Sequence, residues 1–360
     1  MPHLSVMLKP ASSACNMRCK YCFYHSLAES RESYGYGKMT ENTAEEIIKK
    51  TLSFANGDSV YYSFQGGEPL LAGREFFDFF IKTVKRYNVK NSRIFYNIQT
   101  NGTLVDRTWN EFFRNNEILI GLSLDGDRPA NANRLNAEFG ETFERVLDTA
   151  DWFLNDGVEF NILIVATPET ARRAEDIYCF LRDRGYKYHQ YIPVLRPTGS
   201  EGIIDKNYLD NESMFLLLDR LFNLYVRDYV RGNYVSIRLF DNWVRLYRRE
   251  KNEQCGTAGY CTHQLVFEGD GSAYPCDFYC LDEYRLGYIA DSTVEELLKK
   301  NRAESFIKES LPVLDRCKKC AYFRVCRGGG CKRSRADFDY CEAYRKFFEK
   351  NIGAFRVFLR

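Results

Sequence analysis

The sequence predicts an α/β protein, with a parallel sheet in residues 1–234 and a smaller, cysteine-rich domain in residues 235–360. In the first part, short apolar, β-branched runs alternate with segments of 3.6-residue periodicity. A Pro/Gly/Ser-containing stretch at 196–211 and an apolar helix from Ser213 to Arg231 end that alternation. Nine of the thirteen cysteines lie beyond residue 250. A chain of 360 residues is long enough for two such domains.

Six strands are expected, at Leu4–Leu8, Val60–Phe64, Arg93–Gln99, Ile118–Leu124, Glu159–Ala166 and Tyr188–Leu195. Helices are expected between them, at Thr40–Phe54, Arg74–Tyr87, Arg107–Asn115, Thr142–Asn155 and Glu169–Arg184. With the helix after the last strand, this makes six strand–helix units and predicts parallel pairing with right-handed crossovers. Six units fall short of the eight of a closed barrel. An open or partial barrel and a doubly wound sheet fit this pattern equally well.

The C-terminal part loses the alternation. Val266–Tyr274 predicts a hairpin, because Gly269-Asp270-Gly271 is a strong turn signal. We place the domain boundary near residue 235.

Charge and cysteine content limit the classes of function. The 51 Lys+Arg and 49 Asp+Glu residues give a net charge of +2, which argues against binding to nucleic acid or membrane through bulk charge. No targeting segment and no apolar stretch of about 20 residues is seen, so we expect a cytoplasmic protein. Thirteen cysteines beside four histidines in a reducing compartment favour metal or redox chemistry over disulfides.

Three cysteines follow the first strand at CxxxCxxC spacing: Cys15, Cys19 and Cys22. Parallel α/β folds place their chemistry at this end of the strands. Three thiolates on a four-iron cluster leave one iron without a protein ligand, so that iron can bind a substrate or cofactor. The alternatives are a zinc site that lacks its fourth ligand, or three buried core thiols.

This motif resembles the signature of radical S-adenosylmethionine (SAM) enzymes. Three further strand ends match that family, at Gln65-Gly66-Gly67-Glu68-Pro69, Gln99-Thr100-Asn101-Gly102 and Leu122-Ser123-Leu124-Asp125-Gly126. The resemblance implies a partial (β/α)6 TIM-like barrel. It also implies that the open iron chelates the amino and carboxylate groups of SAM.

The resemblance also implies SAM contacts. Gly66 and Gly67 would let the backbone approach the methionyl part, and Glu68 would accept from the ammonium group. The other positions that match family contacts are Tyr21, Ser123, Arg134 and Leu195, with Arg134 as a partner for the SAM carboxylate. Taken singly, Glu68 is an ordinary surface carboxylate, Arg134 a solvated side chain and Leu195 a core residue.

The C-terminal cysteines resemble the SPASM extension of radical SAM enzymes, which carries two auxiliary 4Fe–4S clusters. Three, four and four ligands use eleven of the thirteen thiols and leave Cys179 and Cys280 unassigned; Cys179 is most simply a core residue. Zinc sites also use CxxC pairs. The segment from Cys317 to Ala336 holds seven Lys/Arg and no acid, which suits an anionic cluster; a nucleic-acid patch is the alternative.

Within the SPASM enzymes the chain resembles the anaerobic sulfatase-maturating enzymes over nearly its whole length. The segments that carry this resemblance are Lys9–Ser13, Cys22–His25, Val158–Ile162 and Tyr274–Tyr279. The family pattern assigns Cys255, Cys261, Cys276 and Cys331 to one auxiliary cluster, and Cys317, Cys320, Cys326 and Cys341 to the other. Two departures stand out. The spacer Arg327–Gly330 is one glycine longer than usual, and the stretch from Cys331 to Cys341 is short. A ligand exchange between Cys276 and Cys280 stays open.

Members of that family oxidise a Ser or Cys side chain of a sulfatase to Cα-formylglycine. The 5′-deoxyadenosyl radical takes a hydrogen atom from Cβ, and one proton and one electron must follow. By resemblance, Asp277 is the general base, and Tyr24 lies near the reacting centre, with packing over the cluster as its simpler role. The expected partners are an unfolded or nascent sulfatase and an electron donor such as flavodoxin or ferredoxin.

Two rival functions remain. A SPASM enzyme that cross-links a ribosomal peptide through thioether or C–C bonds would share every cluster. Asp277 favours sulfatase oxidation, and no segment resembles the leader-peptide-binding domain common in peptide maturases. A non-catalytic electron carrier or zinc module would not need an open three-thiolate site.

Overall fold

The computed structural model describes residues 4–198 and 205–359. One ten-stranded sheet organises these residues, in the order β10-β9-β8-β1-β2-β3-β4-β5-β6-β7. Its central strands are β1 (Leu4–Leu8), β2 (Val60–Phe64), β3 (Ile94–Thr100), β4 (Ile118–Ser123), β5 (Phe160–Ala166) and β6 (Tyr188–Pro193). Each pairs in parallel with the next, as the sequence predicts. The six expected strands are confirmed, with ends shifted by at most two residues.

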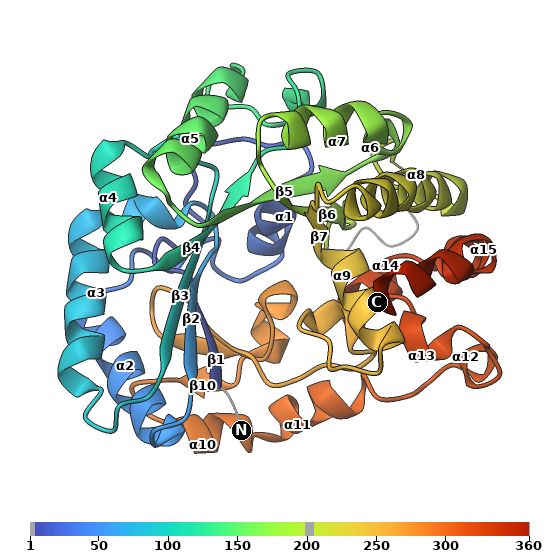
Figure 1. Cartoon of the computed structure of the whole chain (residues 1–360). Coiled ribbons are helices and arrows are strands. Elements are labelled where there is room, and N and C mark those ends of the chain that lie inside the picture. Colours follow the sequence, from blue (N-terminus) through green and yellow to red (C-terminus); the bar gives the residue numbers. More distant parts are fainter. Residues whose placement is uncertain (1–3, 199–204, 360) are drawn as a thin grey trace.

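Helices follow the strands and lie along the outside of the curved sheet in Figure 1. They are α2 (Glu41–Ala55), α3 (Arg74–Tyr87), α4 (Arg107–Asn115) and α5 (Phe143–Asp156). Thr40 caps α2 by accepting from Thr43 N, and Asp106 caps α4 by accepting from Thr108 N and Trp109 N. The apolar stripe of each helix packs on the sheet in one large core cluster.

The expected helix at Glu169–Arg184 is wrong in one respect, since two helices occupy that stretch. A capping box between Thr167 and Thr170 starts α6 (Pro168–Arg172), and α7 (Ala174–Asp183) follows. Arg173 leaves helical geometry between them, at φ −105° and ψ 18°. The Arg173 guanidinium forms an ion pair with Asp127, with 2.5 Å between Nη2 and Oδ2.

C-terminal residues extend the sheet at both edges. The predicted hairpin is formed by β8 (Leu265–Phe267) and β9 (Ser272–Tyr274), and β8 also pairs in parallel with β1. The short strand β10 (Gly287–Tyr288) follows on that side, while β7 (Ser236–Ile237) pairs with β6 on the other. Since β10 and β7 stay unpaired with each other, the sheet is an open, partial barrel. The sequence did not predict β7, β10 or the β1–β8 pairing.

A second core cluster lies between helices of the C-terminal half of the chain. It joins α8 (Asn211–Val230), α9 (Arg238–Tyr247) and α15 (Cys341–Asn351), with Phe222, Phe240 and Phe347 in mutual ring contact. The apolar helix expected from Ser213 is therefore confirmed as α8. Both the sheet and this core run across residue 235, so the division into 1–234 and 235–360 stays a prediction.

The remaining elements are short. The α-helices are α1 (Phe23–Glu29), α10 (Val294–Leu298), α11 (Asn301–Lys308), α12 (Asp315–Lys318), α13 (Phe323–Cys326) and α14 (Lys332–Asp337). The 3₁₀ turns are η1 (Pro69–Ala72), η2 (Ala130–Asn133), η3 (Cys255–Thr257), η4 (Asp277–Tyr279), η5 (Asp282–Tyr284) and η6 (Ile352–Leu359). Among residues 4–198 and 205–359, none of the helices combines the length and the apolar character that crossing a bilayer requires.

Candidate active site

The first thiol loop, Cys15–Cys22, follows the carboxyl end of β1 and runs directly into α1. Its three thiols lie near one another: desolvation raises the pKa of Cys15 to about 12, and Cys22 and Cys19 contribute to that rise. Desolvation likewise raises the pKa of Cys19 to about 11, although Arg134 lowers it. Cys15 Sγ accepts from Met17 N at 3.4 Å and lies 3.9 Å from Asn101 Nδ2. The structure thus brings two of the four matching strand ends together at this loop.

The glycine loop after β2 is tied to the thiol loop through the backbone. Gly67 N donates to Ser12 O at 2.9 Å, and Glu68 N donates to Ala14 O at 2.8 Å. A Cβ on Gly67 would meet Ala14 O at 2.0 Å, so no other residue fits without moving one of the loops. The close approach that requires glycine here is therefore made with the thiol loop itself.

Glu68 is buried and its carboxylate accepts three hydrogen bonds, so the surface interpretation of this residue is wrong. Its Oε1 accepts from Leu70 N at 3.0 Å and Thr100 Oγ1 at 2.9 Å, and its Oε2 accepts from Asn101 N at 2.8 Å. Burial raises the pKa of Glu68 to about 7, although these hydrogen bonds lower it. Through these hydrogen bonds, Glu68 links the carboxyl ends of β2 and β3 next to the thiol loop.

Arg134 is also buried and not solvated. Its Nη2 donates to Asp125 Oδ1 at 2.9 Å, and the Tyr21 hydroxyl donates to the other oxygen of the same carboxylate. Arg134 Nε is buried and has no hydrogen-bond partner among the described residues. Ser123 ends β4 next to this group, whereas Leu195 lies half-buried two residues beyond β6. Tyr21, Ser123 and Arg134 thus share one region with the thiols.

The C-terminal thiols form two groups that interleave along the chain. Desolvation raises the pKa of Cys276, and Cys331 and Cys255 raise it further; desolvation also raises the pKa of Cys331, with Cys261 adding to it. Around Cys326, desolvation raises the pKa to about 12, and Cys317, Cys320 and Cys341 contribute. The neighbours belong to the two expected ligand sets, and their role as cluster ligands stays a prediction. All thirteen thiols are free.

Proximity, and not coordination geometry, defines these groups. In the part of the chain that the structure describes, no three His, Cys, Asp or Glu side chains converge on a single metal ion.

The long glycine spacer separates the two groups. Arg327, Gly328, Gly329 and Gly330 all have positive φ, between 53° and 117°. A Cβ on Gly329 would meet the Tyr344 ring at 3.0 Å. Four residues in this conformation turn the chain so that Cys326 faces one thiol group and Cys331 the other. The spacer, one glycine longer than in the family pattern, therefore has positive φ at all four of its residues.

Asp277 and Tyr24 come together although 253 residues separate them. Tyr24 Oη donates to Asp277 Oδ2 at 2.6 Å and lies 2.9 Å from Gln65 Oε1. Asp277 opens η4, directly after Cys276, and is buried. Burial raises the pKa of the Tyr24 phenol well above its usual value, and the Asp277 charge adds to that effect. A buried carboxylate thus lies between the glycine loop and one C-terminal thiol group.

A buried charge network that the sequence did not predict lies beside Asp277, and only its Lys9 contacts the Asp277 carboxylate. Lys9 Nζ lies 3.1 Å from Asp277 Oδ1 and 3.5 Å from Glu268 Oε1. Glu268 Oε1 also pairs with Arg31 Nη1 at 2.6 Å, and its Oε2 accepts from Ser12 Oγ at 2.7 Å. Single charged residues at strand ends and in hairpins usually face solvent, so no local pattern indicates that Lys9 and Glu268 are buried.

The two unassigned cysteines lie outside the thiol groups. Cys280 is fully buried and its Sγ lies 3.6 Å from Cys276 O. Burial raises the pKa of Cys280 to about 12, whereas neighbouring Lys9 lowers it. Cys179 is half-buried on α7 and packs against the second core cluster.

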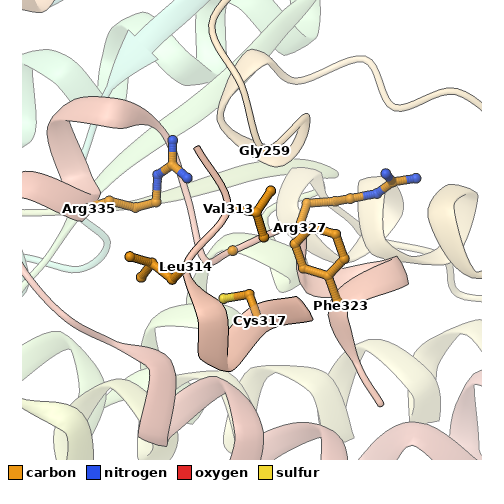
Figure 2. A pocket seen from close by; sticks show the side chains of 8 residues that line it. Gly259, Val313, Leu314, Cys317, Phe323, Arg327 and Arg335 are labelled. Carbon is orange, nitrogen blue, oxygen red and sulfur yellow. The ribbon is translucent and has the colours of Figure 1, made fainter. Parts of the chain in front are cut away.

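A small pocket opens beside Cys317, in the thiol group that includes Cys326. Figure 2 shows Val313, Leu314 and Phe323 around Cys317, with Arg335 and Arg327 on opposite sides. Cations therefore lie near this group, as an anionic cluster would require.

Two family models match the chain. The radical SAM superfamily matches residues 10–181, and the iron–sulfur cluster-binding (SPASM) domain matches residues 255–321. A cysteine-type anaerobic sulfatase-maturating enzyme of Clostridium perfringens (strain 13 / Type A) is 43% identical over 357 residues, covering 97% of this chain and 96% of the relative.

Solved structures agree with these matches. Native anSMEcpe with bound AdoMet has a TM-score of 0.94 and 41% identity, covering 99% of this chain and 100% of the other. The same protein with AdoMet and the Cp18Cys peptide gives a TM-score of 0.93 at 40% identity, covering 99% of each chain. The chain therefore belongs to the radical SAM enzymes with a SPASM domain, in the family of anaerobic sulfatase-maturating enzymes, and its cofactors are SAM and iron–sulfur clusters.

Proposed function

We propose that this enzyme oxidises a cysteine side chain of a sulfatase polypeptide to Cα-formylglycine. The observation that carries the proposal is the buried Asp277 carboxylate, which lies beside Cys276 and 2.6 Å from Tyr24 Oη. It stands between the first thiol loop and the C-terminal thiols, where a target side chain could meet both. The relative at 43% identity is named as a cysteine-type enzyme, which favours Cys over Ser as the target.

The thiol groups suit three 4Fe–4S clusters. Cys15, Cys19 and Cys22 would hold the cluster that binds SAM. Cys255, Cys261, Cys276 and Cys331 would hold one auxiliary cluster, and Cys317, Cys320, Cys326 and Cys341 the other. Free, mutually close thiols are the donor set that such clusters take. Cys280 pairs with Lys9 and not with the thiol groups, which argues against its exchange with Cys276.

The residues around the first loop suit SAM. Arg134 Nε is a buried donor without a partner, which fits the SAM carboxylate. Glu68 would attract the ammonium group, and the region of Tyr21, Ser123, Gly66 and Gly67 would enclose the methionyl part. Leu195 would pack on adenine.

The reaction removes one hydrogen atom, one proton and one electron from the target. When bound, the cofactors supply a 5′-deoxyadenosyl radical that takes the hydrogen atom from Cβ, and an acceptor for the electron. Asp277 takes the thiol proton as general base, while Tyr24 holds the carboxylate in place. Water then hydrolyses the thioaldehyde to the aldehyde and hydrogen sulfide.

The partners follow from this reaction. The sulfatase must present its cysteine in an unfolded or nascent segment, and a flavodoxin or ferredoxin would supply the electron that cleaves SAM. Thirteen free thiols suit a reducing cytoplasm.

The test uses the anaerobic, reduced holoenzyme with SAM and a peptide that carries the sulfatase motif Cys-x-Pro-x-Arg. We expect an aldehyde at the cysteine by mass spectrometry, with methionine and 5′-deoxyadenosine accumulating. The matching Ser peptide measures the preference for Cys. If SAM is cleaved and neither peptide changes, the enzyme is a maturase of another peptide, the rival that shares its clusters.

A further inference from the structure

Lys9 is a buried residue beside Asp277 that has no role in the proposed function. It follows β1 directly and is 2% exposed, although it carries an ammonium group. Its Nζ lies 3.1 Å from Asp277 Oδ1 and 4.9 Å from the centre of the Tyr24 ring. The same side chain therefore touches both residues assigned to proton removal.

We propose that Lys9 is a positioning residue, which holds the Asp277 carboxylate so that Oδ2 faces Tyr24 and the target side chain. This inference rests on the proposed function. A carboxylate is planar, so a cation on one oxygen fixes the direction of the other. Oδ1 is buried and receives no hydrogen bond from any described residue, which leaves the Lys9 ion pair as its contact.

The backbone around Asp277 gives its side chain little hold. Asp277 begins a three-residue 3₁₀ turn, and the nearest backbone bond runs from Tyr279 N to Cys276 O at 3.0 Å. The orientation of the carboxylate therefore depends on Lys9 at one oxygen and Tyr24 at the other.

The other carboxylate near Lys9 does not require its charge. Glu268 already pairs with Arg31 at 2.6 Å and accepts from Ser12 Oγ at 2.7 Å, while Lys9 stands farther away at 3.5 Å. Burying an ammonium costs free energy that an apolar side chain would avoid. Cys280 also lies near Lys9, but of the two carboxylates in this network Asp277 is the one that depends on the Lys9 charge.

The test compares Lys9→Met with Arg31→Met in the holoenzyme. Methionine is close to lysine in length and carries no charge, whereas Arg31→Met removes the other cation of this network, which does not contact Asp277. The main readout is the ratio of 5′-deoxyadenosine to aldehyde with the Cys peptide. We expect Lys9→Met to raise this ratio about tenfold, because a misplaced base lets the radical form without completing the oxidation. Iron content and peptide Kd should stay at wild-type values.

Arg31→Met should keep the wild-type ratio even if it lowers Tm. A crystal structure of Lys9→Met should show that Asp277 Oδ2 has left Tyr24 Oη. An unchanged ratio in Lys9→Met, or an equal rise in Arg31→Met, would overturn the assignment. If Lys9→Met does not fold, Lys9→Arg takes its place. Arginine keeps the cation but moves it, so the ratio of 5′-deoxyadenosine to aldehyde must rise. A wild-type ratio in Lys9→Arg would refute the positioning role. If the wild-type enzyme makes no aldehyde, the proposed function fails instead.

Discussion

The first thiol loop and the C-terminal thiol groups bring their cysteines together in different ways. Cys15, Cys19 and Cys22 lie on one loop, and backbone hydrogen bonds hold it: Arg18 N donates to Leu135 O at 2.7 Å and Lys20 N to Asn133 O at 3.0 Å. The eight C-terminal thiols of the two groups, which leave out Cys280, span residues 255–341 and interleave along the chain. A local set is fixed by its loop, whereas an interleaved set is fixed by the fold around it. Substitutions in the first loop and in the C-terminal groups should therefore have different consequences.

The largest effect is expected from the first loop. Cys19→Ala should abolish both SAM cleavage and aldehyde formation, because an incomplete cluster site offers SAM no iron. Iron should fall from about 12 to about 8 per chain, with the auxiliary clusters intact. Iron analysis and a 5′-deoxyadenosine assay measure this. Cys179→Ala is the matched control and should keep the full iron content. SAM cleavage at the wild-type rate by Cys19→Ala would show that this thiol is no ligand.

Asp277→Asn tests the residue that lies between the first thiol loop and the C-terminal thiol groups. We expect aldehyde formation to fall about 10²- to 10⁴-fold, the usual contribution of a general base, while SAM cleavage continues. Both products are measured in the same reaction. Asp282→Asn changes a nearby half-buried acid and should leave aldehyde formation largely intact. Aldehyde at the wild-type rate from Asp277→Asn would refute the base assignment.

The glycine spacer tests whether the fold fixes the C-terminal groups. Gly329 has φ 82°, and an added Cβ would lie 3.0 Å from the Tyr344 ring. Gly329→Ala should destabilise the protein by about 1–3 kcal/mol and loosen the auxiliary clusters, while the first cluster stays. Denaturant unfolding and iron content report these changes.

The matched control for the spacer is Gly353→Ala. A Cβ at Gly353 meets nothing within 4 Å. Its effect should stay within about 0.5 kcal/mol. Equal effects of the two substitutions would mean that the spacer does not constrain the thiol groups.

The same contrast explains what the sequence could predict. The six strands and the first four helices between them have clear periodicities, so their bounds are accurate to about two residues. No periodicity marks the break at Arg173 that divides the helix expected at Glu169–Arg184. The strands β7 and β10 have two residues each, and β8 joins β1 across more than 250 positions, so no local pattern indicates them. The grouping of Cys331 with Cys255 came from family resemblance alone. Lys9 stands in the segment Lys9–Ser13 that carries the family resemblance, but its role depends on Asp277, which only the fold brings near.

The smallest effect is expected from Cys280, the thiol that neighbours a proposed ligand without joining its group. Cys280→Ala should lower the free energy of unfolding by about 1 kcal/mol, because it removes a buried sulfur atom, and should leave about 12 Fe per chain. Cys276→Ala is the matched comparison and should lose about four Fe. Iron analysis after identical reconstitution separates the two. If the Cys280 variant loses the iron and the Cys276 variant keeps it, then Cys280 is the ligand, and the interleaved group is built around the other end of η4.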